Sequence, residues 1–203
     1  NANQYDRDVY LTRSSDGGLN WDLPVSNLTE YPRNQPSYTA GDEIDVMYDS
    51  RGYLHVIWGA QPTPDNPYRG GYHWPDFGRD LFHWSDAIAG SNLGGTISMI
   101  QYGSYDVNPI ACSYGGFNAG YIGWYSLTEC NGHLYALYNM WHSRVLELGV
   151  DDPTAYDDCG AVIESDGTHS SNAEIMLNVS TSLDGLLWDA PRNLTNTYTP
   201  DCD

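Results

Sequence analysis

Short runs of alternating apolar and polar residues follow one another along the chain, separated by clusters rich in Gly, Pro, Asp and Ser. In the clearest run, Leu54, Val56 and Trp58 alternate with Tyr53, His55 and Ile57. A period of two is typical of β-strands, and aromatic or β-branched residues between turn formers support the same assignment. Because no stretch carries a sustained helical period, the sequence predicts an all-β fold.

Two sequence units recur along the chain, which indicates a repeat architecture. The first is a hairpin centred on glycine: positions 49–58 align with 129–138, so that Gly52 matches Gly132. Glycine suits the positive φ that such a tight turn requires. The second unit begins with a strand at 7–11, 79–83 and 173–177. In its first and last copies the strand leads into a turn, at 14–24 and 182–191, and then into the tripeptide Asn-Leu-Thr.

The order of these units predicts four-stranded antiparallel meanders repeated radially, as in a β-propeller that is entered in the middle of a blade. We expect an outer half-blade at 5–29, a blade at 30–103, a blade with a long insertion at 104–196 and a tail at 197–203. Two and a half blades form an incomplete ring with exposed strand edges. We therefore expect the 203 residues to belong to a longer polypeptide, or to close by assembling with other chains.

The string Ser-x-Asp-x-Gly-x-x-Trp at 14–21 resembles the Asp-box of sialidase-like (BNR-repeat) propellers, and 49–58 looks like their inner hairpin. The resemblance covers about residues 5–196, although the second box is one residue shorter and the middle blade lacks it. The Asp accepts N–H groups of its own turn, and the Trp packs between strands. We therefore interpret the following box residues as structural: Ser14, Asp16, Gly18, Trp21, Ser182, Asp184, Gly185 and Trp188.

Long connections at about 30–43, 59–78, 104–120 and 139–172 all fall on one face of the predicted array. Repeat proteins concentrate binding residues on such a face. Flat aromatic rings and guanidinium groups there suit sugars or ligands with a carboxylate. The candidates are Arg33, Arg69, His73, Trp74, Trp141, His142 and Arg144. The alternative is that Trp74 and Trp141 only pack the insertions against the sheets.

One acidic segment offers oxygen ligands of the kind that Ca²⁺ prefers, at Asp151, Asp152, Asp157 and Asp158. Its spacing does not fit an EF-hand loop, so we favour a solvated acidic loop over a calcium site, and no other cofactor is expected. The six histidines show no zinc-binding spacing. His55 and His83 lie within predicted strands, where we interpret them as hydrogen-bonded polar residues of the blade.

Charge narrows the range of partners. Asp plus Glu number 27 against 8 Arg and no Lys, so the net charge is −19, which disfavours binding to nucleic acid or anionic lipid. No run of 18 apolar residues occurs, so we expect no membrane insertion.

Glycosylation sequons at Asn27, Asn178 and Asn193 accompany four cysteines that can form disulfides: Cys112, Cys130, Cys159 and Cys202. This combination fits an extracellular, cell-surface or periplasmic glycoprotein.

The resemblance implies specific residues for a sialidase: three Arg for the substrate carboxylate, a Tyr nucleophile with an acidic partner, and an Asp acid/base. The motif that supplies the first Arg has no match, since Tyr31-Pro32-Arg33 has a different order. The first hypothesis is therefore an exported, non-catalytic propeller module that binds a glycan or protein partner through its long-loop face. The second is a glycoside hydrolase whose catalytic residues lie in missing blades. The third is a structural component of a cell-surface layer, fibre or complex.

Overall fold

The computed structural model describes residues 7–32, 37–63, 80–87, 95–103, 122–141 and 173–195, without the side chains at 42, 62, 63, 141, 173 and 174. These residues form antiparallel strands and no helix, which confirms the predicted all-β class. The strands are β1 (Tyr10–Leu11), β2 (Ser26–Asn27), β3 (Ser37–Tyr48), β4 (Leu54–Thr63), β5 (Asp80–Ser85), β6 (Thr96–Gln101), β7 (Ile122–Cys130), β8 (His133–Trp141), β9 (Ala173–Val179) and β10 (Arg192–Asn193).

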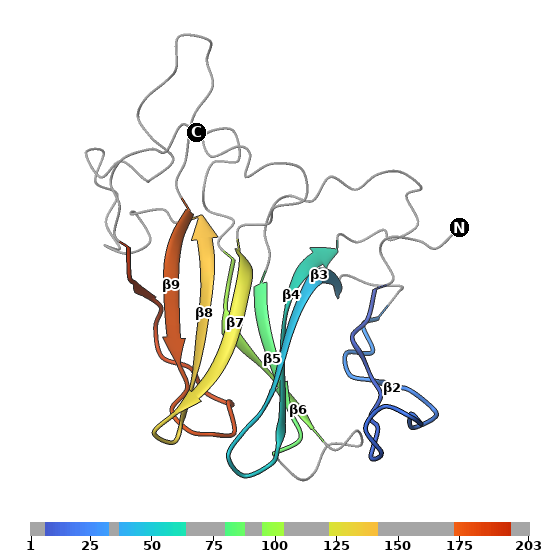
Figure 1. The fold of residues 1–203 in the computed structure, drawn as a ribbon. Helices are drawn as coiled ribbons and strands as arrows, with labels where there is room; N and C mark the ends of the chain where they lie inside the picture. Colours follow the sequence, from blue (N-terminus) through green and yellow to red (C-terminus); the bar gives the residue numbers. More distant parts are fainter. Residues whose placement is uncertain are drawn as a thin grey trace, which may run out of the picture.

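The strands form one two-stranded hairpin and two four-stranded sheets, in which each strand pairs with its neighbours in sequence. We call them the N-terminal hairpin (β1–β2), the first sheet (β3–β6) and the second sheet (β7–β10). The two sheets stand side by side, and the N-terminal hairpin lies on the far side of the first sheet (Figure 1). The chain therefore contains a half meander followed by two complete meanders.

Strand register repeats from one unit to the next. The outer strand pairs are equivalent in all three units: Tyr10 pairs with Asn27, Phe82 with Met99 and Met176 with Asn193. The middle strands agree as well, because Ile57 pairs with His83 where Leu137 pairs with Leu177. Register decides which side chains share a face of a sheet, so residues at equivalent positions can be compared directly.

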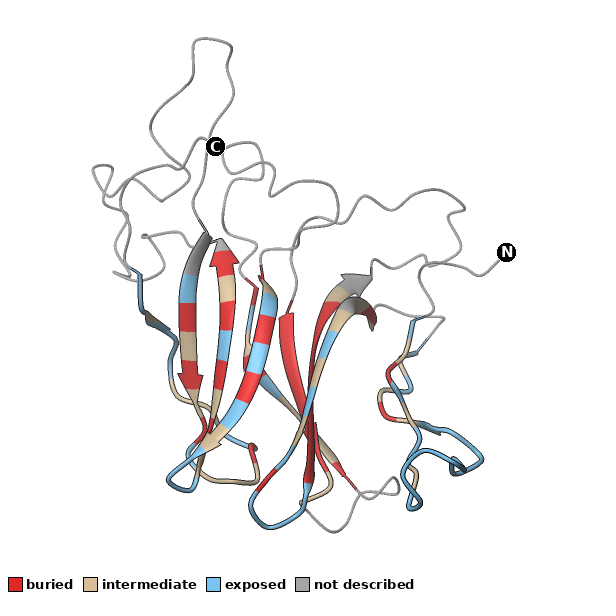
Figure 2. Cartoon of the chain, viewed as in Figure 1, coloured by how far each residue is buried: buried red, intermediate tan, exposed pale blue. Residues whose placement is uncertain are grey.

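The core consists of two layers, one on each face of the first sheet. Val56 and Trp58 face the N-terminal hairpin and pack with its Val9. Ile57 and Leu81 face the second sheet. Both sets of alternating residues are buried, and positions 54–60 of β4 are buried without interruption (Figure 2). The alternation read in the sequence therefore separates two covered faces rather than a core face from a solvent face.

Strand β3 begins earlier than the sequence indicates. Positions 37–43 fall in a range expected to be a connecting loop, but β3 pairs with β4 from Ser37 to Tyr48. A register shift between Ala40 and Ile44 allows this. A bulge keeps two strands paired although their apolar alternation is broken, which is why the pattern alone did not reveal the strand.

Candidate functional site

Most of the predicted ligand-binding residues lie outside the described ranges. This applies to Arg33, Arg69, His73, Trp74, His142 and Arg144, to the acidic residues Asp151, Asp152, Asp157 and Asp158, and to Cys112, Cys159 and Cys202. Trp141 is the last residue of β8, and only its backbone is described. These assignments remain predictions from the sequence.

The described strand ends show where the long connections start. Because neighbouring strands are antiparallel, the end of β4 and the start of β5 lie at the same end of the first sheet (Figure 1). The end of β8 and the start of β9 lie at the corresponding end of the second sheet. The short turns at 49–53 and 131–132 lie at the opposite end, which we call the turn end.

The first turn that resembles an Asp-box is held together by its own side chains. The Asp16 carboxylate accepts the N–H of Asn20 at 2.9 Å, and the Ser14 hydroxyl accepts the N–H of Gly18 at 2.8 Å. Gly17 and Gly18 both have positive φ. Hydrogen bonds from Asn20 and Ser14 lower the pKa of Asp16 to about 2. Asp16 thus stabilises its turn, in the structural role expected from the sequence.

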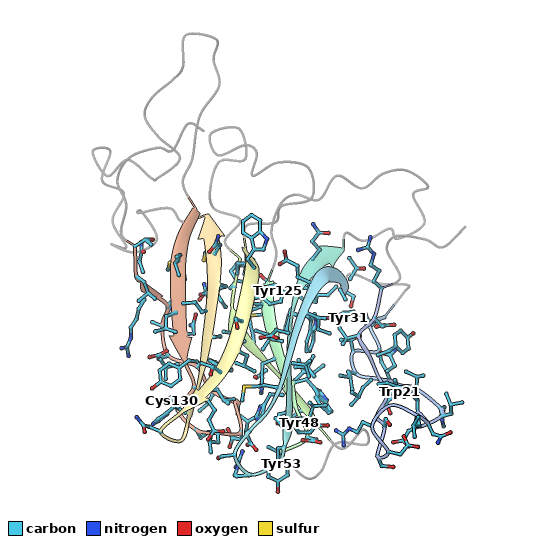
Figure 3. All side chains as sticks on the ribbon, viewed as in Figure 1. Trp21, Tyr31, Tyr48, Tyr53, Tyr125 and Cys130 are labelled. Atoms are coloured by element: carbon cyan, nitrogen blue, oxygen red, sulfur yellow. The ribbon has the colours of Figure 1, made fainter. Side chains whose placement is uncertain are left out.

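Trp21 does not pack between strands as expected, because 58% of its surface is exposed (Figure 3). The matching Trp188 is half-buried against the core between the two sheets, and its ring meets that of His83 at 5.5 Å. The difference follows from position: Trp188 has the first sheet beside it, whereas among the described residues no sheet covers the outer side of the N-terminal hairpin.

A buried polar network connects the two sheets at the turn end. The Asp49 carboxylate lies 3.3 Å from Nε2 of His55, and Nδ1 of His55 lies 2.9 Å from Nε2 of His83. Nδ1 of His83 lies 3.2 Å from the Ser98 hydroxyl, which donates to the carbonyl of Gly185. The network therefore runs from the β3–β4 turn across β4, β5 and β6 into the turn of the second sheet.

Arg51 adds a second link between the same turns. Its guanidinium makes two hydrogen bonds to Asp49, of 2.9 and 2.7 Å, and donates to the carbonyl of Leu183 at 2.9 Å. Burial acts to raise the pKa of Asp49, but Arg51, the Tyr53 N–H and His55 outweigh it, so that this pKa is lowered. Asp49 is therefore ionised at neutral pH.

Burial shifts the pKa values of the two histidines downward, whereas it acts to raise the pKa of Asp49. Loss of solvent lowers the pKa of His55, although Asp49 opposes the change. For His83, burial and then the neighbouring His55 lower the pKa to about 3. Both imidazoles are therefore neutral at pH 7.

Proton counting shows what this network can do. Its four contacts run from Asp49 through His55, His83 and Ser98 to Gly185, yet two neutral imidazoles and one hydroxyl supply only three protons. Since Asp49 is ionised, His55 must donate to it through Nε2 and accept from His83. The Ser98 proton can then serve either His83 or the Gly185 carbonyl, which also accepts the Trp188 N–H at 2.9 Å. One added proton on His83 would satisfy all four contacts.

The order acid, base, base, hydroxyl resembles relays that activate a serine nucleophile. Here, however, the Ser98 hydroxyl contacts the Gly185 carbonyl and lies 3.4 Å from Nε1 of Trp188. The Ser98 hydroxyl is thus hydrogen-bonded to the turn of the second sheet, and the network joins the two sheets. This confirms His55 and His83 as hydrogen-bonded strand residues, here of β4 and β5. Sequence reasoning missed Asp49 and Ser98 as their partners and Arg51 as a partner of Asp49. The conformation of the β3–β4 turn brings Asp49 to His55 and Arg51, and strand register pairs Ser98 with His83.

The three sequons have different surroundings. The side chain of Asn178 is fully buried, and its Nδ2 donates to the carbonyl of Asp189 at 2.7 Å. A glycan on Nδ2 would need that space, so the expected glycosylation at Asn178 is incompatible with the folded chain. Asn27 and Asn193 are half-buried, and each accepts a backbone N–H at 3.1 Å through Oδ1. Cys130, the one described cysteine, is exposed at the end of β7 (Figure 3).

Within the described ranges, no group of His, Cys, Asp and Glu side chains is arranged to hold a metal ion. No helix in those ranges has the length and hydropathy to cross a membrane. Comparisons with protein-family models, curated proteins and solved structures found no match.

Proposed function

We propose that this chain is an exported, non-catalytic β-propeller module of the sialidase-like kind, which binds a glycan or protein partner through the sheet end that carries the long connections. The observation that carries this proposal is the repeated strand register. Three outer strand pairs and two inner ones share one register, so the chain is built from copies of a single unit.

A repeated meander presents equivalent strand ends side by side. In this chain the short β3–β4 and β7–β8 turns occupy one end, and the three longest connections between strands, at 64–79, 102–121 and 142–172, begin at the other. A rigid scaffold that concentrates its insertions on one face is the usual design of a binding surface. The insertions contain the aromatic and Arg candidates that suit a sugar or a carboxylate.

The described acid–base groups support binding over catalysis. Asp49, His55 and His83 are buried and hydrogen-bonded to one another at the turn end. Asp16 is engaged within its own turn. These groups serve the scaffold, and they lie at the end opposite to the long connections.

A glycan array that pairs each sialylated glycan with its desialylated form tests the proposal. Release of fluorophore from 4-methylumbelliferyl sialoside, measured in parallel, tests whether these 203 residues by themselves hydrolyse a sialoside. We expect binding without hydrolysis. Arg69→Ala and Arg144→Ala should each weaken binding to sialylated glycans about tenfold, because each removes a charge-assisted hydrogen bond.

The matched control is Arg192→Ala, which removes a guanidinium from the strand β10. It should bind as the parent does. Fluorophore release by the parent would contradict the non-catalytic proposal and place catalytic residues within this chain. Equal binding by all three variants would contradict a site on the long connections.

A further inference from the structure

Each sheet has a forward face, directed toward the unit that follows in sequence, and a rear face, directed toward the unit before. Leu81 lies on the forward face of the first sheet, and Phe82 lies on its rear face. In the N-terminal hairpin the equivalent positions are Val9 and Tyr10, and in the second sheet they are Ile175 and Met176. The repeated register therefore allows covered and uncovered faces to be compared within one molecule.

Among the residues that the structure describes, two forward faces are covered and the third is not. Val9 and Leu81 are 6% and 0% exposed, but the equivalent Ile175 is 37% exposed. Leu28 is 3% exposed, whereas its equivalent Leu194 is 54% exposed. The rear face of the next unit covers each of the first two faces. The second sheet thus presents an apolar forward face of the kind that the chain elsewhere buries.

The rear faces show the opposite pattern. Phe82 and Met176 are 9% and 1% exposed, but Tyr10 is 56% exposed. On the inner strands, Leu127 is 6% exposed and the equivalent Val46 is 56% exposed. Tyr10 therefore marks an uncovered rear surface on the N-terminal hairpin, whereas Val46 belongs to the rear face of the first sheet, at a position that the hairpin leaves exposed.

The chain already forms this outer-strand interface twice: Val9 and Leu28 pack in one core cluster with Phe82, and Leu81 and Ile100 pack in the other with Met176. We infer that a second copy of this chain docks the rear surface of its N-terminal hairpin, which contains Tyr10, on the forward face that contains Ile175 and Leu194. The contact is heterologous, since it joins different surfaces of the two copies. This inference rests on the repeat array of the proposed function and adds an occupant for its uncovered faces. The net charge of −19 opposes association, so screening by salt should strengthen it.

Sedimentation velocity of the 203-residue chain across a concentration series, at low and high NaCl, tests the inference. We expect species at multiples of 22.6 kDa, favoured by salt. Ile175→Glu on the forward face and Tyr10→Glu on the rear face should each weaken association about a hundredfold, because a carboxylate is buried without a partner. Leu19→Glu adds the same charge at a residue that is 83% exposed at a turn tip, and it should associate as the parent does.

Mixing the two variants distinguishes a heterologous contact from any other. The Ile175→Glu chain keeps an intact rear surface and the Tyr10→Glu chain keeps an intact forward face, so the mixture should form a two-chain complex although each variant alone stays monomeric. Leu194→Glu provides a second forward-face variant should Ile175→Glu prove misfolded by circular dichroism.

A parent chain that stays monomeric at all concentrations and salt levels overturns the inference, as does a mixture without two-chain complexes. If the chain binds glycans but stays monomeric, the docking inference is wrong and the proposed function is unaffected. If the chain associates but binds no glycan, the docking inference is supported and the proposed glycan binding is contradicted.

Discussion

Gly185 lies where the second sheet meets the first, and its α-carbon faces the buried ring of His83. A β-carbon at this position would come within 2.3 Å of Cε1 of His83. Gly185 also has a positive φ of 67°. Two independent constraints, space and backbone conformation, therefore require glycine in this turn.

Gly185→Ala should destabilise the chain by about 1–3 kcal/mol more than Gly132→Ala, because overpacking a rigid neighbour adds to the backbone strain. Gly132 has a φ of 79°, and a β-carbon there would have no atom within 4 Å, so this position isolates the strain alone. Urea unfolding of both variants provides the comparison. Equal losses would show that His83 moves aside at little cost.

The neutral state of His83 makes stability depend on pH. Its folded-state pKa of about 3 lies below the ordinary 6.5, so between these values the unfolded chain binds a proton that the folded chain does not. The contribution of His83 to the free energy of unfolding is therefore fully present above pH 6.5. It should fall by about 1.4 kcal/mol per pH unit as the pH is lowered toward 3. Asp184 faces His83 and Asp86 faces His55, and both favour the protonated imidazoles.

His83→Leu should reduce that slope in urea unfolding measured from pH 7 to 4. Ser98→Ala is the matched control, because it removes the hydroxyl of the network but leaves both imidazoles. It should keep the slope of the parent. A His83→Leu slope equal to that of the parent would place the titrating group elsewhere.

At the scale of elements, carboxylates of β3 accept backbone N–H groups of β7, the edge strand of the second sheet. The Asp45 carboxylate accepts the N–H of Leu127 at 2.8 Å, and the Glu43 carboxylate accepts the N–H of Trp124 at 2.8 Å. Tyr125 fits between the two sheets, where its hydroxyl donates to the carbonyl of Glu43 (Figure 3). Unsatisfied N–H groups on an edge strand invite pairing with other strands, and these side chains satisfy two of them.

Asp45→Ala should cost about 1–3 kcal/mol, because it leaves the N–H of the buried Leu127 without its acceptor. Glu129→Ala is the matched control: Glu129 also joins the sheets, through the N–H and hydroxyl of Ser50, but at an exposed site. Its loss should stay below about 1 kcal/mol. Urea denaturation midpoints, at unchanged m-values, give the difference in free energy of unfolding between the two variants. A larger loss of stability for Glu129→Ala than for Asp45→Ala would contradict the role assigned to Asp45.

At the scale of the whole molecule, 27 acidic against 8 basic residues create a repulsion that folding concentrates. Raising NaCl from about 20 mM to about 500 mM shortens the Debye length several-fold and should raise the melting temperature by a few degrees. The measurement uses the Ile175→Glu variant, because a variant that stays monomeric shows the effect of salt on folding without the effect of salt on association.

CaCl2 at matched ionic strength is the control for a specific cation. If the acidic segment at 151–158 is a solvated loop, calcium and sodium should stabilise the chain alike. A calcium effect that saturates at low concentration would instead support the calcium site at Asp151, Asp152, Asp157 and Asp158. A melting temperature that falls with salt would contradict the repulsion argument.

The sequence by itself determined the all-β class and the order of the units, because a period of two and recurring turn residues are local properties. The alignment of positions 7–11, 79–83 and 173–177 matches the observed register. Asp16 could be placed in its turn for the same reason, since its partners lie within four residues.

Only the tertiary structure decided which faces are covered and which polar groups meet. The Asp49–His55–His83–Ser98 network depends on register across β4, β5 and β6 and on the turn that contains Gly185, which lies far from these strands in the chain. Asn178 and Asn193 carry the same sequon signal, yet one is buried and the other is not. Tyr10 and Met176 occupy the same register position, yet within the described ranges only Met176 is covered by a neighbouring sheet. Burial depends on what packs against a residue, and that neighbour comes from elsewhere in the sequence.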